Sequence, residues 1–361
     1  MRVMIISVDL GDPDHTAHAE EFEMLARGAG AEVVETVNVR RDRPDAKHFI
    51  GSGKVNEAAL IAQAHDAELV LFDQPLSPSQ QRNLETAFNL RVVDRVALIL
   101  DIFALRAKSH EGKLQVELAQ LQHLSTRLTR MWTHLERQRG GIGMRGPGEA
   151  QLEMDRRIIG DKVKLLRERL DKVERQRTTQ RRARVRSGTL SVSLVGYTNA
   201  GKSTLFNALT RAGTYVADQL FATLDTTTRR IWIEEAGAVT ISDTVGFIRD
   251  LPPNLIAAFK ATLEETVHAD LLLHVVDAAS PQRDEQIFEV NKVLADIGAD
   301  EIPTILVYNK IDLAGLEPRV DRDAHGTIAR VFVSASERAG LEALRGAIAA
   351  GRSDCGKQCV E

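Results

Sequence analysis

The sequence predicts an α/β protein with three parts: an N-terminal α/β domain, a helical hairpin and a C-terminal α/β domain with a doubly wound sheet. Short apolar runs alternate with helical patterns over residues 1–108 and residues 189–353, which is typical of parallel sheets covered by helices. Residues 109–188 instead carry apolar residues at spacings of three, four or seven, which favours two helices packed on each other. Residues 354–361 form a short polar tail.

The N-terminal domain begins with a strand-like apolar run and repeats this pattern along its length. The expected strands are RVMIISV, AEVVETVNV, ELVLFD and RVVD, at residues 2–8, 31–39, 68–73 and 91–94. Helical patterns separate them near residues 20–27, 55–64 and 80–88. The run IGSGK, at residues 50–54, lacks the spacing of a phosphate-binding loop, so we expect an ordinary turn there.

Two apolar seams predict the antiparallel helices of the hairpin. The first seam is Leu114, Leu118, Leu121, Leu128, Trp132 and Leu135, and the second is Ile159, Val163, Leu166, Leu170 and Val173. Five glycines and a proline interrupt the helical pattern between Arg139 and Glu153. A long glycine-rich connection is therefore expected between the two helices.

The hairpin is also the basic part of the chain. Residues 124–187 hold 18 Lys and Arg against 8 Asp and Glu, whereas the whole chain has a formal charge of −4. This asymmetry favours a polyanionic partner, with a solvated coiled coil as the alternative interpretation. Aromatic residues make up only 4% of the chain, so contacts to phosphates are expected rather than base stacking.

The composition argues against several classes of protein. The longest apolar run, Val96–Leu105, contains Asp101 and is too short to cross a bilayer. The N-terminus turns acidic after its first strand candidate, unlike a signal peptide. Cys355 and Cys359 are the two cysteines and supply neither a zinc site nor a disulfide framework. We expect a monomeric, cytoplasmic protein without a membrane span, with a membrane-peripheral fraction as an additional expectation.

The C-terminal domain opens with a phosphate-binding motif. GYTNAGKST follows the strand candidate LSVSLVG and precedes a helical pattern, the context that G-x-x-x-x-G-K-[ST] requires. The N–H groups of this loop would surround phosphates, Lys202 would contact the β- and γ-phosphates, and the Ser203 hydroxyl would ligate Mg²⁺. This P-loop consists of Gly196, Tyr197, Thr198, Asn199, Ala200, Gly201, Lys202, Ser203 and Thr204.

The remaining strand candidates of this domain are RRIWIEE, AVTISD, LLLHVVD, TILVYNK and VFVSAS. Further motifs lie at the ends of three of them, AVTISD, TILVYNK and VFVSAS. The motifs are DTVG (Asp243, Thr244, Val245 and Gly246), NKID (Asn309, Lys310, Ile311 and Asp312) and SAS (Ser334, Ala335 and Ser336). Asp243 is typical of a Walker-B aspartate, and the N–H of Gly246 could donate to a γ-phosphate. The Asp312 carboxylate can accept two hydrogen bonds from guanine, whereas adenine offers neither donor. The motifs together predict binding of GTP and GDP.

The chain resembles the HflX family of ribosome-associated GTPases over nearly its full length. The resemblance lies in GIGMRGPGEAQLEMDRR before the C-terminal domain and in FIGSGKV, LSPSQQRNLE and EGKLQVELAQL. It implies a P-loop GTPase domain and binding to the large ribosomal subunit and its rRNA, with splitting or rescue of ribosomes as the function. A ribosome-assembly GTPase and an RNA-remodelling or RNA-binding protein with a structural nucleotide are the alternatives. Some relatives carry an additional C-terminal domain where this chain has its tail.

The resemblance also indicates the switch I residues. The family pattern matches FATLD, which is Phe221, Ala222, Thr223, Leu224 and Asp225, and it implies Thr223 as the second Mg²⁺ ligand beside Ser203. Spacing alone leaves three further threonines open, at Thr226, Thr227 and Thr228.

Phe247 follows Gly246, where related GTPases often carry a glutamine that orients the attacking water. A phenyl ring cannot do this, so we expect slow turnover alone and stimulation by ribosomes. Either Phe247 only anchors switch II, or another group supplies the missing function. Asn199 is the candidate within the chain, with K⁺ as an additional cofactor, and the ribosome is the candidate in trans. The expected catalytic residues are Lys202, Asn199 and Gly246.

Overall fold

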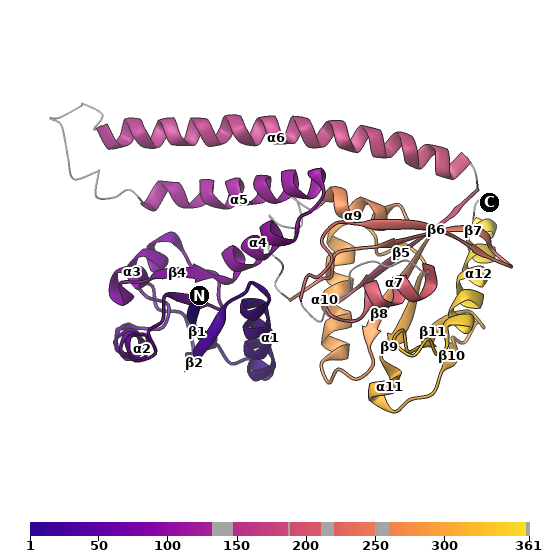
Figure 1. The fold of residues 1–361 in the computed structure, drawn as a ribbon, viewed down its shortest axis with the longest axis horizontal. Coiled ribbons are helices and arrows are strands. Elements are labelled where there is room, and N and C mark those ends of the chain that lie inside the picture. The colour runs from indigo at the N-terminus through magenta and orange to yellow at the C-terminus, as the bar shows by residue number, and fades with distance from the viewer. Residues whose placement is uncertain (132–146, 187, 211–219, 250, 252–259, 359–361) are drawn as a thin grey trace. The chain divides into compact units, whose positions relative to one another are not determined.

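The computed structural model describes residues 1–131, 147–186, 188–210, 220–249, 251 and 260–358 (Figure 1). The chain divides into two compact units. The N-terminal unit consists of Met1–Leu105 and Lys113–Arg169, and the C-terminal unit consists of Arg106–Gly112 and Leu170–Glu361. The prediction of an α/β protein with a P-loop domain, a second α/β domain and long helices is confirmed.

The N-terminal unit contains a four-stranded parallel sheet in the order β2-β1-β3-β4. The strands are β1 (Arg2–Asp9), β2 (Glu32–Arg40), β3 (Leu69–Phe72) and β4 (Arg91–Asp94), close to the predicted ranges. The helices are α1 (His15–Gly28), α2 (Ser52–Ala64), α3 (Pro78–Phe88) and α4 (Arg95–Arg106). In IGSGK, Ile50 and Gly51 precede α2, but Ser52, Gly53 and Lys54 form its start, so the predicted turn is wrong for these three residues. Helix α4 was not predicted.

One buried cluster shows how this sheet is covered. Met4, Ile6 and Phe72 of the strands lie in the same core as Ala58 of α2 and Leu84 of α3. Alternate strand residues point to this face because successive side chains of a strand lie on opposite sides. The alternating pattern of sequence elements therefore produces a helix-covered parallel sheet.

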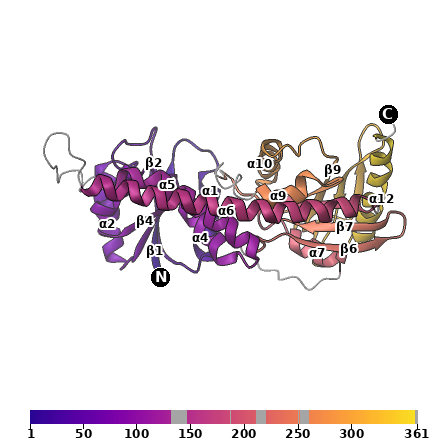
Figure 2. The ribbon, with the colours of Figure 1, turned by 90° about the horizontal axis from the view of Figure 1, so that it is seen from above.

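Two long helices follow, α5 (His110–Met131) and α6 (Pro147–Arg186). Their parts within the N-terminal unit run side by side in opposite directions in Figure 1, and α6 lies over α5 in the view of Figure 2. Leu114, Leu118 and Leu166 of the predicted seams are buried. Helix α6 begins at Pro147, so the predicted interruption between Arg139 and Glu153 is wrong for its last seven residues. Residues 132–146, with Trp132, Leu135 and most of the predicted glycines, lie outside the described residues.

The C-terminal unit contains a seven-stranded sheet in the order β10-β11-β9-β8-β5-β7-β6. The strands are β5 (Leu190–Gly196), β6 (Thr227–Ile233), β7 (Gly237–Asp243), β8 (Leu271–Asp277), β9 (Thr304–Asn309), β10 (Arg319–Arg322) and β11 (Ile328–Phe332). Edge strands β6 and β10 are antiparallel to their neighbours, and the central strands are parallel. The chain leaves β5 toward β7 and returns to β8 on its other side. A doubly wound sheet binds ligands at such a reversal.

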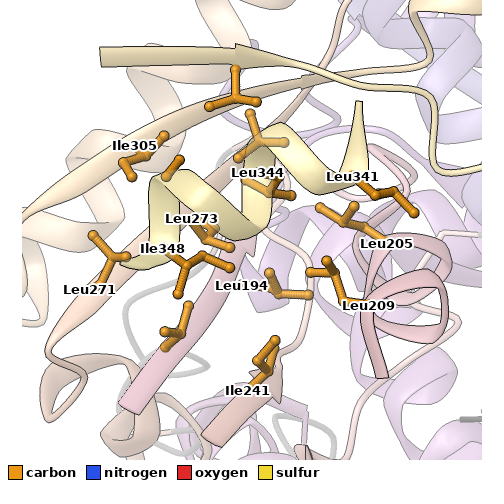
Figure 3. Packing of buried hydrophobic residues seen from close by; sticks show 14 of the residues in the cluster. Leu194, Leu205, Leu209, Ile241, Leu271, Leu273, Ile305, Leu341, Leu344 and Ile348 are labelled. Carbon is orange, nitrogen blue, oxygen red and sulfur yellow. The ribbon is translucent and has the colours of Figure 1, made fainter. Parts of the chain in front are cut away.

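The described helices of this unit are α7 (Lys202–Thr210), α9 (Lys260–Val267), α10 (Arg283–Asp296), α11 (Ile311–Ala314) and α12 (Leu341–Gln358). Figure 3 shows Leu344 and Ile348 of α12 packed against the strands together with Leu205 of α7. This core supports β5 and α7, which carry the P-loop between them. No helix in the described ranges is long and apolar enough to span a membrane.

Candidate nucleotide-binding site

The P-loop joins the end of β5 to the start of α7 by a turn with unusual backbone angles. Gly196, Asn199 and Gly201 have φ values of +148°, +60° and +89°. A Cβ atom at Gly201 would lie 2.3 Å from Nδ2 of Asn309, so the loop requires glycine for both its backbone angle and this contact. The sequence therefore dictates a tight loop at the carboxyl end of a central strand.

Lys202 lies inside this loop and is almost fully buried. Its Nζ donates hydrogen bonds to the carbonyl oxygens of Gly196, at 3.0 Å, and Tyr197, at 2.8 Å. Burial lowers the pKa of Lys202 to about 8, and the charge of Asp243 offsets part of this effect. A partly desolvated cation held by neutral carbonyls is well suited to a multiply charged phosphate.

Three oxygen-bearing side chains converge beside Lys202. The Ser203 hydroxyl lies 2.7 Å from Oδ2 of Asp243 and 2.7 Å from the Thr223 hydroxyl. Asp243 is fully buried, and burial raises the pKa of its carboxyl. Its Oδ1 has no hydrogen-bond partner within the described residues. Hard oxygen donors around a buried carboxylate with a spare oxygen fit Mg²⁺.

Switch I, residues 221–225, is held by two buried apolar side chains, Phe221 and Leu224, on either side of Thr223. Of the alternative threonines, Thr227 and Thr228 lie in β6, paired with Asp243 and Ser242 of β7. The geometry therefore supports Thr223 as the metal-ligand candidate. Asp225 does not join the convergent group, because its carboxylate contacts the backbone of Lys108 and Ser109.

The residue in place of glutamine, Phe247, is buried and joined to the P-loop. Its N–H donates to the Gly196 carbonyl at 3.1 Å, and its carbonyl accepts from the N–H of Thr198 at 2.7 Å. Phe247 is 2% exposed, so its ring is enclosed by the protein rather than presented to solvent. This geometry favours the interpretation that Phe247 anchors switch II.

Asn309 of NKID connects the phosphate loop to the SAS loop. Its Nδ2 donates to the Ala200 carbonyl at 3.0 Å, and its Oδ1 accepts from the N–H of Ala335 at 3.0 Å. Lys310 forms a 2.7 Å ion pair with Asp277. Sequence reasoning missed Asp277, although it ends β8 directly opposite Asn309. Asp312 is exposed in the first turn of α11.

A cleft of about 310 Å³ joins these parts, within the range of small-ligand sites. Its lining was predicted from the sequence with the exception of Leu313. The lining residues are Thr198, Asn199, Gly201, Lys202, Ser203, Thr204, Phe221, Ala222, Thr223, Thr244, Gly246, Lys310 and Leu313. Asp312, Ser334 and Ser336 do not line it, and their assignment to the base pocket stays a prediction.

Comparison with protein families divides the chain into three matching regions. Residues 16–104 match the family described as GTP-binding GTPase N-terminal, and residues 106–184 match the GTP-binding GTPase middle region. Residues 191–310 match the family described as 50S ribosome-binding GTPase. These matches follow the order of the elements described above.

Individual relatives agree with the family matches. GTPase HflX of Escherichia coli (strain K12) is 56% identical over 326 residues, covering 90% of this chain and 76% of that protein. GTPase HflX of Caldanaerobacter subterraneus subsp. tengcongensis is 46% identical over 347 residues, covering 96% and 79%. A solved structure described as "SsGBP and GDP complex" shares the fold, with a TM-score of 0.54, 24% identity and coverage of 96% and 97%. The chain belongs to the HflX family of ribosome-associated GTPases.

Proposed function

We propose that this GTPase binds the large ribosomal subunit and acts in the splitting or rescue of ribosomes under stress. The convergence of Ser203, Thr223 and Asp243 beside Lys202 is the observation that carries the nucleotide chemistry. Family membership and the match to a 50S ribosome-binding GTPase support the choice of partner. The protein converts GTP and water to GDP and phosphate.

The P-loop and the switches divide the work on the substrate. Lys202 leaves the carbonyls of Gly196 and Tyr197 and contacts the β- and γ-phosphates, where its charge stabilises the transition state. Ser203 and Thr223 would hold Mg²⁺, which supplies positive charge to the phosphates when bound. The N–H of Gly246 donates to the γ-phosphate, so loss of that phosphate releases both switches.

The assignment of guanine rests on NKID. Ile311, the first residue of α11, is buried, while Asp312 after it is exposed, so the Asp312 carboxylate is accessible to a base. The Lys310–Asp277 ion pair fixes the backbone just before it. An accessible carboxylate at this position can accept hydrogen bonds from guanine, whereas adenine offers neither donor.

A buried Phe247 leaves the water-orienting function to another group. Asn199 is our candidate within the chain, because it lines the cleft and has a φ of +60° that turns the loop at that point. A K⁺ ion beside Asn199 would add positive charge where the transition state is negative. The ribosome is the competing supplier in trans. Equal GTPase rates in NaCl and KCl would eliminate the K⁺ hypothesis.

Contact with rRNA is assigned to the basic residues 124–187. Helix α6 exposes a series of basic residues, among them Lys162, Arg167 and Lys172. The side chains of Arg181, Arg182, Arg184 and Arg186 lie outside the described residues. Replacing these four arginines should weaken binding to the large subunit and flatten its salt dependence.

The decisive experiment measures GTP turnover in KCl with and without purified large ribosomal subunits. Saturable stimulation supports the proposal, and an appreciable rate that the subunits do not change contradicts it. Sucrose-gradient sedimentation of intact ribosomes then separates the two ribosomal functions. Conversion to subunits on addition of protein and GTP supports splitting, whereas stimulation without splitting favours a ribosome-assembly GTPase.

A further inference from the structure

Asp225 of switch I is attached to the two residues directly before helix α5, of which Ser109 lies 116 positions earlier in the sequence. Its Oδ2 accepts hydrogen bonds from the backbone N–H groups of Lys108 and Ser109, each at 2.8 Å. Its Oδ1 accepts a hydrogen bond of 2.5 Å from the Ser109 hydroxyl. Both carboxylate oxygens are therefore used at this one place.

The start of α5 is shaped to receive this carboxylate. Ser109 precedes the helix, and its hydroxyl oxygen also accepts from the N–H of Gly112 at 2.8 Å, as an N-cap residue does. A Cβ atom at position 112 would lie only 2.3 Å from Oδ1 of Asp225. Glycine in the first turn of a helix lowers helix stability by about 1 kcal/mol relative to alanine, so the close approach of Asp225 gives a reason for it.

The same turn contacts the long helix α6. Glu111, the neighbour of Gly112, forms a 2.8 Å ion pair with Arg177 of α6. Burial raises the pKa of the Glu111 carboxyl, while Arg177 lowers it. The first turn of α5 thus holds switch I through Asp225 and α6 through Glu111.

Switch I has a second fixed point two residues away. The Thr223 hydroxyl lies 2.7 Å from that of Ser203 at the proposed metal site. Leu224, between Thr223 and Asp225, is 3% exposed. Because two residues span at most about 7 Å, the anchored carboxylate of Asp225 limits how far Thr223 can move away from the site.

We propose that Asp225 is a positioning residue for GTP hydrolysis, which holds Thr223 in place through the N-terminus of α5 and couples the state of switch I to helices α5 and α6. This inference rests on the proposed role of Thr223 at the metal site. The coupling is reciprocal by thermodynamic necessity, so a partner that moves the start of α5 changes the affinity of switch I for its ligands.

The test breaks the contact from each side in the full-length protein. Asp225→Ala removes the acceptor, and Gly112→Ala pushes the carboxylate away by placing a methyl group in its position. We expect kcat for GTP to fall about tenfold in both variants, the equivalent of one lost hydrogen bond to a charged group. Affinity for GDP should stay within about twofold of the wild-type value, because switch I responds to the γ-phosphate and GDP lacks it. Asp225→Asn keeps part of the acceptor set and should give an intermediate kcat.

Matched controls repeat the same chemical changes elsewhere. Asp323→Ala removes a carboxylate that accepts from the backbone N–H groups of His325 and Thr327 in an exposed turn. Gly160→Ala adds a methyl group to helix α6 where no atom lies within 4 Å. Both control variants should hydrolyse GTP at the wild-type rate.

Two results would overturn the inference. One is a wild-type kcat in both Asp225→Ala and Gly112→Ala. The other is a fall in GDP affinity that matches the fall in kcat, because a merely structural role affects both nucleotide states. If Asp225→Ala fails to fold, Gly112→Ala and Ser109→Ala carry the same comparison. Normal turnover in a Thr223→Ala variant would instead contradict the proposed metal site. Failure of that proposal can therefore be told apart from failure of the inference about Asp225.

Discussion

The buried ammonium of Lys202 predicts that GTP binding takes up a proton in mildly alkaline buffer. In the protein without bound nucleotide, burial lowers the pKa of Lys202 from 10.5 to about 8. Before binding, about half of the molecules therefore carry a neutral Lys202 at pH 8, and about one tenth do at pH 7. Phosphate oxygens favour the charged amine, so bound GTP raises this pKa and the missing proton is taken up.

Isothermal titration calorimetry of GTP with Mg²⁺, in two buffers of different ionisation enthalpy, measures this uptake. We expect about 0.5 proton per GTP at pH 8 and about 0.1 at pH 7. Because the complex binds more protons than the free protein, affinity falls as the pH rises through 8. Lys202→Met keeps an unbranched side chain without the titrating group and should bind GTP more weakly with no uptake. If the wild-type protein takes up less than about 0.1 proton per GTP at pH 8, the reasoning is refuted.

Three further predictions concern the metal site, the base and the core. Thr223→Ala should lower kcat at least about tenfold, whereas Thr228→Val in strand β6 should not; equal rates for both variants would contradict the assignment. Asp312→Asn should weaken GTP binding about a hundredfold in equilibrium titrations, through lost hydrogen bonds to a charged group, and an unchanged affinity would remove Asp312 from the base pocket. Leu344→Ala, in a fully buried site, should lower the free energy of unfolding by about 2–5 kcal/mol in urea titrations, and Leu60→Ala, at a 68% exposed position, by less than about 0.5 kcal/mol.

The sequence was informative wherever a pattern is local. The strands next to the P-loop, NKID and SAS were predictable because apolar runs and turn residues lie within a few positions of each other. Helix α4 escaped prediction, since its apolar run Val96–Leu105 reads equally well as strand or helix. Strand β10 is short and largely polar, so its sequence alone gives little sign of the strand that pairs with β11.

The less predictable features of the site depend on contacts between distant residues. Asp225 was assigned to the nucleotide site by its place in FATLD, but its carboxylate reaches Ser109, 116 positions away. Asp277 and Leu313 join the site through the pairing of β8 with β9 and the position of α11. No spacing rule within one stretch of sequence reports such neighbours, because the sheet order decides them.

The two hydrogen bonds of Asn309 have a consequence for the entropy of binding. They join Ala200 of the P-loop to Ala335 of the SAS loop, so the two loops are ordered together when the protein folds. Ordering a loop on ligand binding would otherwise oppose association by about 1–2 kcal/mol per residue at room temperature. Because that ordering belongs to folding here, a ligand that contacts both loops meets a preorganised surface.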